Sequence, residues 1–283
     1  MAKLFGRKVQ VQIDTLVVDG LRVAFKIEKS LSPDPNKVEV SIYNLSEDSR
    51  KRLQKKDATI IVQAGYEENI AQIFRGTLRT VSHVMNGGDR VTKITAGDGE
   101  KELRSVRINE SMASGATIEA VAKKLIDALG LKTGNALTEL SKGGFRSGLT
   151  DFANGKVLHG LASRELEKLL KSAGLSYSVQ DGALQLLRPG DALQTEAVLL
   201  NAGTGLIGSP EYGETGKDKK ITLKVRSLLQ PTLFPGRRVK IESATVNAVL
   251  RVDKVTHNGD THAQAWYSEL ECSGAGEAKG IAA

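Results

Sequence analysis

Two stretches of alternating apolar and polar residues, one toward each end of the chain, enclose a middle stretch with helical periodicity. In the first stretch Val9, Val11 and Ile13 alternate with polar residues, and residues 38–42 repeat the pattern. In the last stretch residues 221–225 and 249–255 do the same. A period of two turns one face of a strand to a core and the other to water. Both ends of the chain are therefore predicted to form sheets.

The middle stretch carries apolar residues at the spacing of one helical face, with Thr117 as N-cap and Gly130 as the stop. A second helix is predicted from Leu158 to Ala173, and Asp181-Gly182 predicts a hairpin. Residues 132–155, which are rich in glycine, are interpreted as a long loop. The residues of the first helical face are Ile118, Val121, Ala122, Leu125, Ile126 and Leu129.

These patterns predict a mostly β protein with a smaller α/β part, in which two similar β-barrel domains flank a middle α/β domain. A chain of 283 residues also exceeds what one core usually organises. We expect an N-terminal barrel over 1–107, an α/β domain over 108–195, a C-terminal barrel over 196–272 and a flexible tail over 273–283.

The two β stretches echo each other. Val81-Ser82-His83 stands before Asn86-Gly87, and Val255-Thr256-His257 stands before Asn258-Gly259, which is interpreted as the last tight turn. Chance similarity among β sequences is the alternative explanation. If the echo is a repeat, a trimer presents six similar units, which can meet a sixfold partner on one side and a threefold partner on the other.

No residue pattern points to catalysis, and we expect no catalytic, cofactor-binding or metal-binding residues, no cofactor and no enzyme activity. Residues 203–208 spell Gly-x-Gly-x-x-Gly, but Ser209-Pro210 follows where a helix should begin. Residues 97–100 begin like such a loop but lack its third glycine. The histidines are His83, His159, His257 and His262, and the pair 257 and 262 is better explained as structural or surface residues than as metal ligands.

Bulk composition narrows the class further. Cys272 is the only cysteine, which excludes an intrachain disulfide and a thiolate metal cluster. No apolar run reaches the length of a membrane span or of a signal peptide. The net charge of +7 is compatible with an acidic partner, yet the basic cluster at residues 50–56 is flanked by acids. A β-barrel nucleic-acid binder and a cell-wall hydrolase component remain as alternatives.

Several segments, in order, resemble the phage baseplate or tail hub family, which includes the central hub of contractile tails and is related to the base of type VI secretion spikes. The resemblance runs from about residue 36 to 271. The segments are residues 37–46, residues 64–66 with 73–76, residues 204–211, residues 227–236, and residues 257–260 with Trp266-Tyr267.

The resemblance implies a structural protein of the virion, in the tail baseplate, assembled in the bacterial host cytoplasm. It implies a homotrimer that joins the sixfold tail tube to the threefold tip spike around a central channel. Contacts with the tape-measure protein and other baseplate proteins are implied as well. No membrane contact is expected, and no specific nucleic-acid binding beyond passage through the channel.

Overall fold

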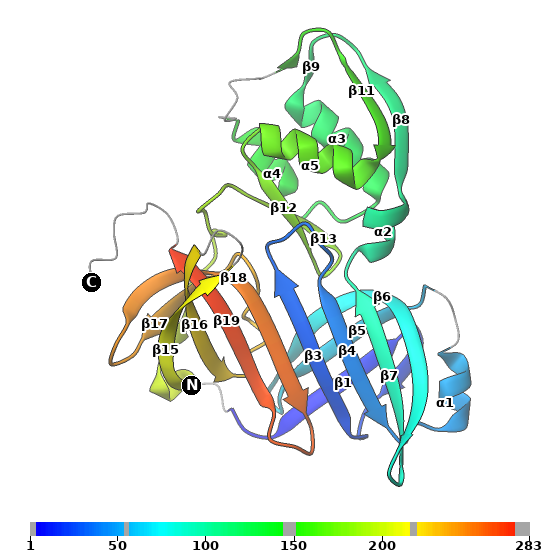
Figure 1. The fold of residues 1–283 in the computed structure, drawn as a ribbon, viewed down its shortest axis with the longest axis vertical. Coiled ribbons are helices and arrows are strands. Elements are labelled where there is room, and N and C mark those ends of the chain that lie inside the picture. The colour runs from blue at the N-terminus through cyan, green and yellow to red at the C-terminus, as the bar shows by residue number, and fades with distance from the viewer. Residues whose placement is uncertain (1–3, 54–56, 144–150, 216–219, 275–283) are drawn as a thin grey trace. The chain divides into compact units, whose positions relative to one another are not determined.

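A computed structural model describes residues 4–53, 57–143, 151–215 and 220–274, and the chain divides into two compact units (Figure 1). Unit 1 comprises residues 1–31, 36–97 and 190–283. Unit 2 comprises residues 32–35 and 98–189. Strands predominate, so the protein is mostly β with a few helices, as the sequence predicts. Among the described residues, none of the helices combines the length and the apolar character needed to cross a membrane.

Unit 1 is built on one 13-stranded sheet, which is antiparallel except where β14 pairs with β17. Its main path runs β15-β16-β19-β18-β3-β4-β7-β6-β5-β1-β2. The strands are β1 (Arg7–Ile13), β2 (Leu16–Val18), β3 (Val23–Ser30), β4 (Lys37–Tyr43), β5 (Thr59–Tyr66), β6 (Asn69–Asn86), β7 (Asp89–Gly97), β14 (Val198–Leu200), β15 (Leu206–Thr215), β16 (Lys220–Leu228), β17 (Arg238–Glu242), β18 (Asn247–Asp260) and β19 (Trp266–Gly274). The helices of this unit are α1 (Glu47–Arg52) and the 3-10 turn η1 (Ala202–Thr204).

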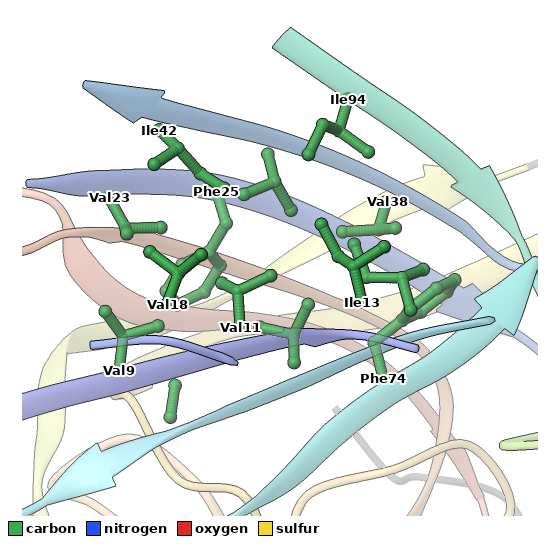
Figure 2. Close-up of a cluster of buried hydrophobic side chains, with 14 of the residues drawn as sticks. Val9, Val11, Ile13, Val18, Val23, Phe25, Val38, Ile42, Phe74 and Ile94 are labelled. Atoms are coloured by element: carbon green, nitrogen blue, oxygen red, sulfur yellow. The ribbon is translucent and has the colours of Figure 1, made fainter. Parts of the chain in front are cut away.

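The alternation seen in the sequence is the alternation of burial. In β3, Val23, Phe25 and Ile27 are buried while Lys26 between them is exposed. The buried side chains of unit 1 form two apolar clusters. One comes mainly from β1 to β7 and also includes Leu229 and Trp266, and the other comes from β14 to β19. Figure 2 shows the first cluster, in which side chains of β1 and β2 face those of β3, β4 and β7.

The strands β3 to β7 and the strands β15 to β19 pair in the same order. In the first set β3 pairs β4, β4 pairs β7, β7 pairs β6, and β6 pairs β5. In the second set β15 pairs β16, β16 pairs β19, β19 pairs β18, and β18 pairs β17. We call these two sets the N-repeat and the C-repeat.

The repeats agree in register as well as in order. One residue is skipped at the same place in each: Arg79 between the pairs Leu78–Ala96 and Thr80–Thr95, and Asp253 between the equivalent pairs of β18 and β19. Counted from these bulges, His83 and His257 occupy the same position. The short Val-Ser/Thr-His motif is therefore repeated in structure, which chance similarity does not explain.

Unit 2 is a small α/β unit around its own core. Helix α3 has the predicted cap, since the Thr117 side chain accepts a bond from the Ala120 backbone, and Gly130 ends it with a left-handed φ of 68°. The hairpin of β12 and β13 turns at Asp181-Gly182, as predicted. The elements are α2 (Glu100–Ser105), β8 (Arg107–Met112), β9 (Ala116–Thr117), α3 (Ile118–Leu129), α4 (Ala136–Ser141), β10 (Asp151–Phe152), β11 (Lys156–Leu161), α5 (Ala162–Ser172), β12 (Ser176–Gln180) and β13 (Ala183–Leu187).

Two predictions for this unit were wrong. The segment 132–155 is not one long loop, because it contains α4 and β10; residues 144–150 of it lie outside the described residues. Asn135 holds α4 in place by exchanging two hydrogen bonds with the Leu186 backbone, each 2.8 Å long. The second helix begins at Ala162 rather than Leu158, because residues 156–161 pair with β8.

The predicted tight turn at Asn258-Gly259 was also wrong. Both residues lie inside β18 and pair with β19 on one side and β3 on the other. Two ladders of backbone hydrogen bonds outweigh the local turn preference of this dipeptide. The chain instead reverses after Asp260. Strand β19 then runs to Gly274, and the rest of the expected tail lies outside the described residues.

Candidate assembly interface

The two repeats join at the pairing of β3 with β18. Residues 24–30 of β3 face residues 254–260 of β18 in an unbroken antiparallel register. The two strands lie side by side in Figure 1. This joint turns two sheets into one, and it shows which strand edges of a repeat are complementary.

An ion pair closes one end of the joint. Arg22 donates from Nη2 to Asp260 Oδ2 at 2.9 Å and from Nε to Oδ1 at 3.3 Å. Oδ1 also accepts the backbone N–H groups of His262 and Ala263. Burial opposes ionisation of Asp260, but these donors outweigh it and hold the pKa of the carboxyl below its usual value. Asp260 thus caps the β18–β19 turn and ties it to the N-repeat.

A second arginine reaches the same turn from β1. The Arg7 guanidinium donates to the backbone carbonyls of Asp260 at 3.2 Å, Ala263, and Gln264 at 3.3 Å. It lies over the Trp266 ring, 5.7 Å from the centroid, and that ring meets Phe25 edge-on at 5.8 Å. Strand β1 therefore holds the turn of the C-repeat by hydrogen bonds to its carbonyls and by stacking of the Arg7 guanidinium on the Trp266 ring.

His257 lies buried within the joint. Its Nδ1 is 2.8 Å from Ser268 Oγ, across the β18–β19 ladder. Burial, and then the charge of Lys29, lower the pKa of His257 to about 3, although a bond with the Leu233 backbone opposes the shift. The ring is therefore neutral at neutral pH. Its equivalent His83 lies 3.1 Å from Thr92 Oγ1 in the same arrangement but is exposed.

Comparing the two repeats identifies the strands that match β18 and β3, and each of these has one edge without a neighbouring strand among the described residues. Residues 80–86 of β6 match residues 254–260 of β18, yet among the described strands they pair with β7 alone. Strand β15 matches β3 and pairs only with β16. Both edges expose apolar side chains: Val84 and Met85 on β6, Ile207 and Tyr212 on β15. An exposed apolar strand edge is a site for pairing with another chain.

The β15 edge is interrupted. Three residues, 208–210, stand opposite a single residue of β16, Gly208 has a φ of +69°, and Pro210 has no N–H to donate. Only the segments on either side of this bulge can extend a ladder. Pairing on β15 is thereby limited in register.

The remaining residues weighed in the sequence have structural positions. His159 lies on β11 at 3.4 Å from Asn109 Oδ1, and His262 is exposed in the turn after β18. Within the described ranges no three or more His, Cys, Asp or Glu side chains gather where they could hold a metal ion.

Neither glycine motif forms a phosphate loop. Residues 203–208 run from η1 into β15, where Asn201 and Thr204 cap each other. Asp98 is buried and accepts the backbone N–H groups of Asp181 and Gly182. It therefore fastens the β12–β13 hairpin.

Sequence reasoning gave Arg7 and Arg22 no role, because they stand far from Asp260 in the chain and no local pattern marks them. It included Asp260 in the segment 257–260 that carries the family resemblance, but it did not predict the contacts of this residue with the two arginines.

The fold is that of phage tail proteins. The 43 kDa tail protein of prophage MuSo2 from Shewanella oneidensis superposes with a TM-score of 0.68 at 8% identity, over 95% of this chain and 97% of that one. A tail protein from Neisseria meningitidis MC58 gives 0.64 at 12% identity, over 95% and 96%. An E. coli component of the type VI secretion system gives 0.61 at 11% identity, over 94% and 77%. No curated protein sequence matches the chain.

The chain belongs to the baseplate hub gp41 family, whose sequence model matches residues 7–272. It is therefore a structural protein of the phage tail, and its place is the tail of the virion. The resemblance identified from the sequence is confirmed.

Proposed function

We propose that this hub protein works as a homotrimeric adaptor, in which three copies form a ring that joins a sixfold tail tube to a threefold spike. Each copy contributes two similar β-barrel domains, over 1–107 and 196–272, with the α/β domain 108–195 between them. The partners are the tail tube protein, the tip spike protein, the tape-measure protein and neighbouring baseplate proteins, met after assembly in the host cytoplasm.

The joint between the repeats carries this proposal. Within one chain the β18 edge of the C-repeat pairs with the β3 edge of the N-repeat. The equivalent edges are residues 80–86 of β6 and the outer side of β15, and neither has a second strand beside it in the part of the chain that the structure describes. A second copy can therefore add its β15 to β6 by the same pairing. When every copy contacts the next through the same head-to-tail interface, the copies close into a ring if the rotation between neighbours is a whole-number fraction of a full turn. Three copies give six repeats joined by six similar joints.

Repeat equivalence also supplies the register of the joint between copies. In the internal joint Asn258 faces Lys26. Val84 is the equivalent of Asn258, because each stands one residue after the repeated histidine. Glu211 is the equivalent of Lys26. In the C-repeat Glu211 pairs with Lys224, and Lys224 pairs with Glu271. In the N-repeat Lys26 pairs with Glu39, and Glu39 pairs with Thr95, which is the equivalent of Glu271. We therefore expect Val84 of one copy to face Glu211 of the next.

A cysteine pair tests this register. Val84→Cys together with Glu211→Cys should form disulfides between copies under mild oxidation, because facing residues of antiparallel strands have Cα atoms about 4.5–5.5 Å apart. The native Cys272 is buried and does not compete. Denaturing gels should show a ladder that ends at three chains. Light scattering of unmodified protein should give about three times 30.3 kDa for the protein alone, and that mass plus the mass of the spike for the complex with its spike partner.

The matched control moves one cysteine by one residue. Val84→Cys with Tyr212→Cys turns the two thiols to opposite faces of the sheet, so it should stay uncrosslinked. Equal crosslinking of both pairs would contradict the register. A strict monomer in light scattering under both conditions would contradict the ring itself.

A further inference from the structure

Equivalent positions of the two repeats carry charges of opposite sign on the face of the sheet that points away from the core. Lys26 on β3 is the equivalent of Glu211 on β15, and the residues that face them, Glu39 and Lys224, are reversed in the same way. All four side chains are exposed. Each repeat therefore keeps the pair of charges but exchanges its signs.

A third position is reversed near the other edge of each repeat. Lys93 on β7 faces Ser82, and Glu269 on β19 faces Thr256. Ser82 and Thr256 each stand directly before the repeated histidine, so Lys93 and Glu269 are equivalent as well, and both are exposed. At its two edges the N-repeat therefore carries lysine where the C-repeat carries glutamate.

The internal joint brings these opposite charges together. Thr256 of β18 stands between Glu28 of β3 and Glu269 of β19, and Lys26 lies two residues from Glu28. Glu28, at 2.7 Å from the Lys26 ammonium, raises the pKa of Lys26 most, and the charges of Glu39 and Glu269 raise this pKa further. Glu269 belongs to the other repeat and acts across β18. The two repeats therefore attract each other across their joint.

The proposed joint between copies repeats this arrangement with the signs exchanged. When Val84 of one copy faces Glu211 of the next, Ser82 faces Gly213 of that next copy, because the strands are antiparallel. Lys93 pairs with Ser82 on its other side. Lys93 of one copy and Glu211 of the next therefore occupy the two charged positions of the internal joint.

Both of these charges are available to another copy. Lys26 has its ion-pair partner Glu28 two residues along β3. Gly213 stands at this place on β15, so Glu211 lacks the same-strand partner. Within the part of the chain that the structure describes, neither Glu211 nor Lys93 makes an ion pair, and both side chains are exposed.

A steric difference separates the internal joint from the joint between copies. A Cβ at Gly259 of β18 would stand 2.3 Å from the Phe25 ring of β3. Met85 holds the equivalent position on β6. Strand β6 is therefore a poor replacement for β18 beside β3, so shape also opposes pairing of two N-repeats through these strands.

We propose that the reversed charges sort the contacts between copies, so that the β6–β7 edge of one copy accepts β15 of another copy and rejects a second β6–β7 edge. This rests on the proposed ring. In the head-to-tail joint Lys93 attracts Glu211, whereas pairing of two like edges brings together two lysines or two glutamates. Copies then join in one direction only, and the symmetric dimer, which would stop at two chains, is disfavoured.

Reversing one charge at a time tests the sorting. Lys93→Glu or Glu211→Lys alone puts like charges into every head-to-tail joint. Each should raise the concentration at which half of the protein is assembled by about tenfold, measured by sedimentation velocity at low salt. High salt should reduce this deficit, because it screens exposed charges. The matched controls Lys123→Glu and Glu119→Lys make the same changes of net charge at exposed positions of α3 and should shift assembly far less.

The double variant Lys93→Glu with Glu211→Lys exchanges the signs in every joint and should recover most of the loss. Lys224 faces position 211 within the same copy. The double variant is therefore compared with Glu211→Lys alone, which carries the same local repulsion. A double variant that assembles no better than Glu211→Lys alone would overturn the proposal.

A capture experiment reads the sorting without depending on the overall affinity. Tagged Lys93→Glu protein is mixed with equal amounts of untagged Lys93→Glu and untagged Glu211→Lys protein, and the retained copies are identified by mass. Glu211→Lys copies should be retained in severalfold excess, and equal retention would overturn the proposal. A trimer that is indifferent to the charge reversals removes this inference alone, whereas a strict monomer of the unmodified protein removes the ring and this inference together.

Discussion

The N-repeat and the C-repeat share their strand order, their bulge and their histidine, yet the same positions have different surroundings in the two. His257 is buried and His83 is exposed. Gly259 lies under the Phe25 ring and its equivalent Met85 is exposed. Asp260 pairs with Arg22, whereas its equivalent Asn86 carries no charge and lies on the edge strand β6. The difference has one cause: β18 has β3 beside it, whereas the same stretch of β6 pairs with β7 alone among the described strands. Substituting equivalent residues therefore measures what the neighbouring strand contributes.

The largest difference is expected at the paired histidines. His257→Ala leaves a cavity and removes the partner of the buried Ser268 hydroxyl, so it should lower the free energy of unfolding by about 3 kcal/mol. His83→Ala at the exposed equivalent should change it by less than about 0.5 kcal/mol. Urea unfolding of the two variants makes the comparison, and equal losses would show that the surroundings do not matter.

Acid should sharpen the same contrast. The unfolded chain protonates His257 near pH 6.5, but the folded chain resists this down to about pH 3. The unfolded state therefore binds more protons in this window, and stability is lost as pH falls through it. From pH 6.5 to 5 the free energy of unfolding should fall by about 2 kcal/mol. His257→Gln should remove most of this slope; a slope that survives would assign it to other groups.

Gly259 should give an intermediate effect. A Cβ at this position would stand 2.3 Å from the Phe25 ring, which is itself buried against Trp266. Gly259→Ala should therefore lower the free energy of unfolding by about 1–2 kcal/mol. Met85→Ala is the matched control and should be nearly neutral, because Met85 is 63% exposed. Thermal unfolding of both variants tests this, and a neutral Gly259→Ala would mean that Phe25 can move aside.

The smallest effect is expected for the ion pair. Asp260→Asn keeps an acceptor for the turn but loses the charge that Arg22 holds, and should lower Tm by about 2 °C at neutral pH. The pKa of the Asp260 carboxyl is lower in the folded chain than in the unfolded chain. The ion pair therefore stabilises the fold fully above the unfolded pKa, and this stabilisation is lost as pH falls through the folded pKa. The variant and the parent should therefore converge as pH falls through the folded pKa of Asp260. Asn86→Ala is the matched control.

The sequence predicted the parts of the fold that local patterns determine. Alternation at Val9, Val11 and Ile13 and the stripe on α3 were enough for strand and helix, because burial acts on the same periodicity. The caps Thr117 and Gly130 were also readable, since capping is local chemistry. The two barrels and their boundaries stay a prediction.

The wrong predictions fall where contacts with distant segments of the chain determine the local structure. Asn258-Gly259 has a strong local preference for a turn, but the β3 ladder keeps it extended. Residues 156–161 were apolar enough for a helix, but β8 offers them a ladder. The joint residues Arg7, Arg22 and Asp260 meet across more than 230 positions of sequence. No local pattern carries such information.

The bulge of β15 has a consequence for growth of the assembly. A flat, continuous edge would accept a neighbour in several alignments and could recruit copies without limit, as fibrils do. The kink at Gly208 and the missing donor at Pro210 leave two short stretches that only one alignment fits at once. A subunit with this edge therefore accepts only one register of strand pairing with its neighbour. The interrupted edge also disfavours open-ended polymers.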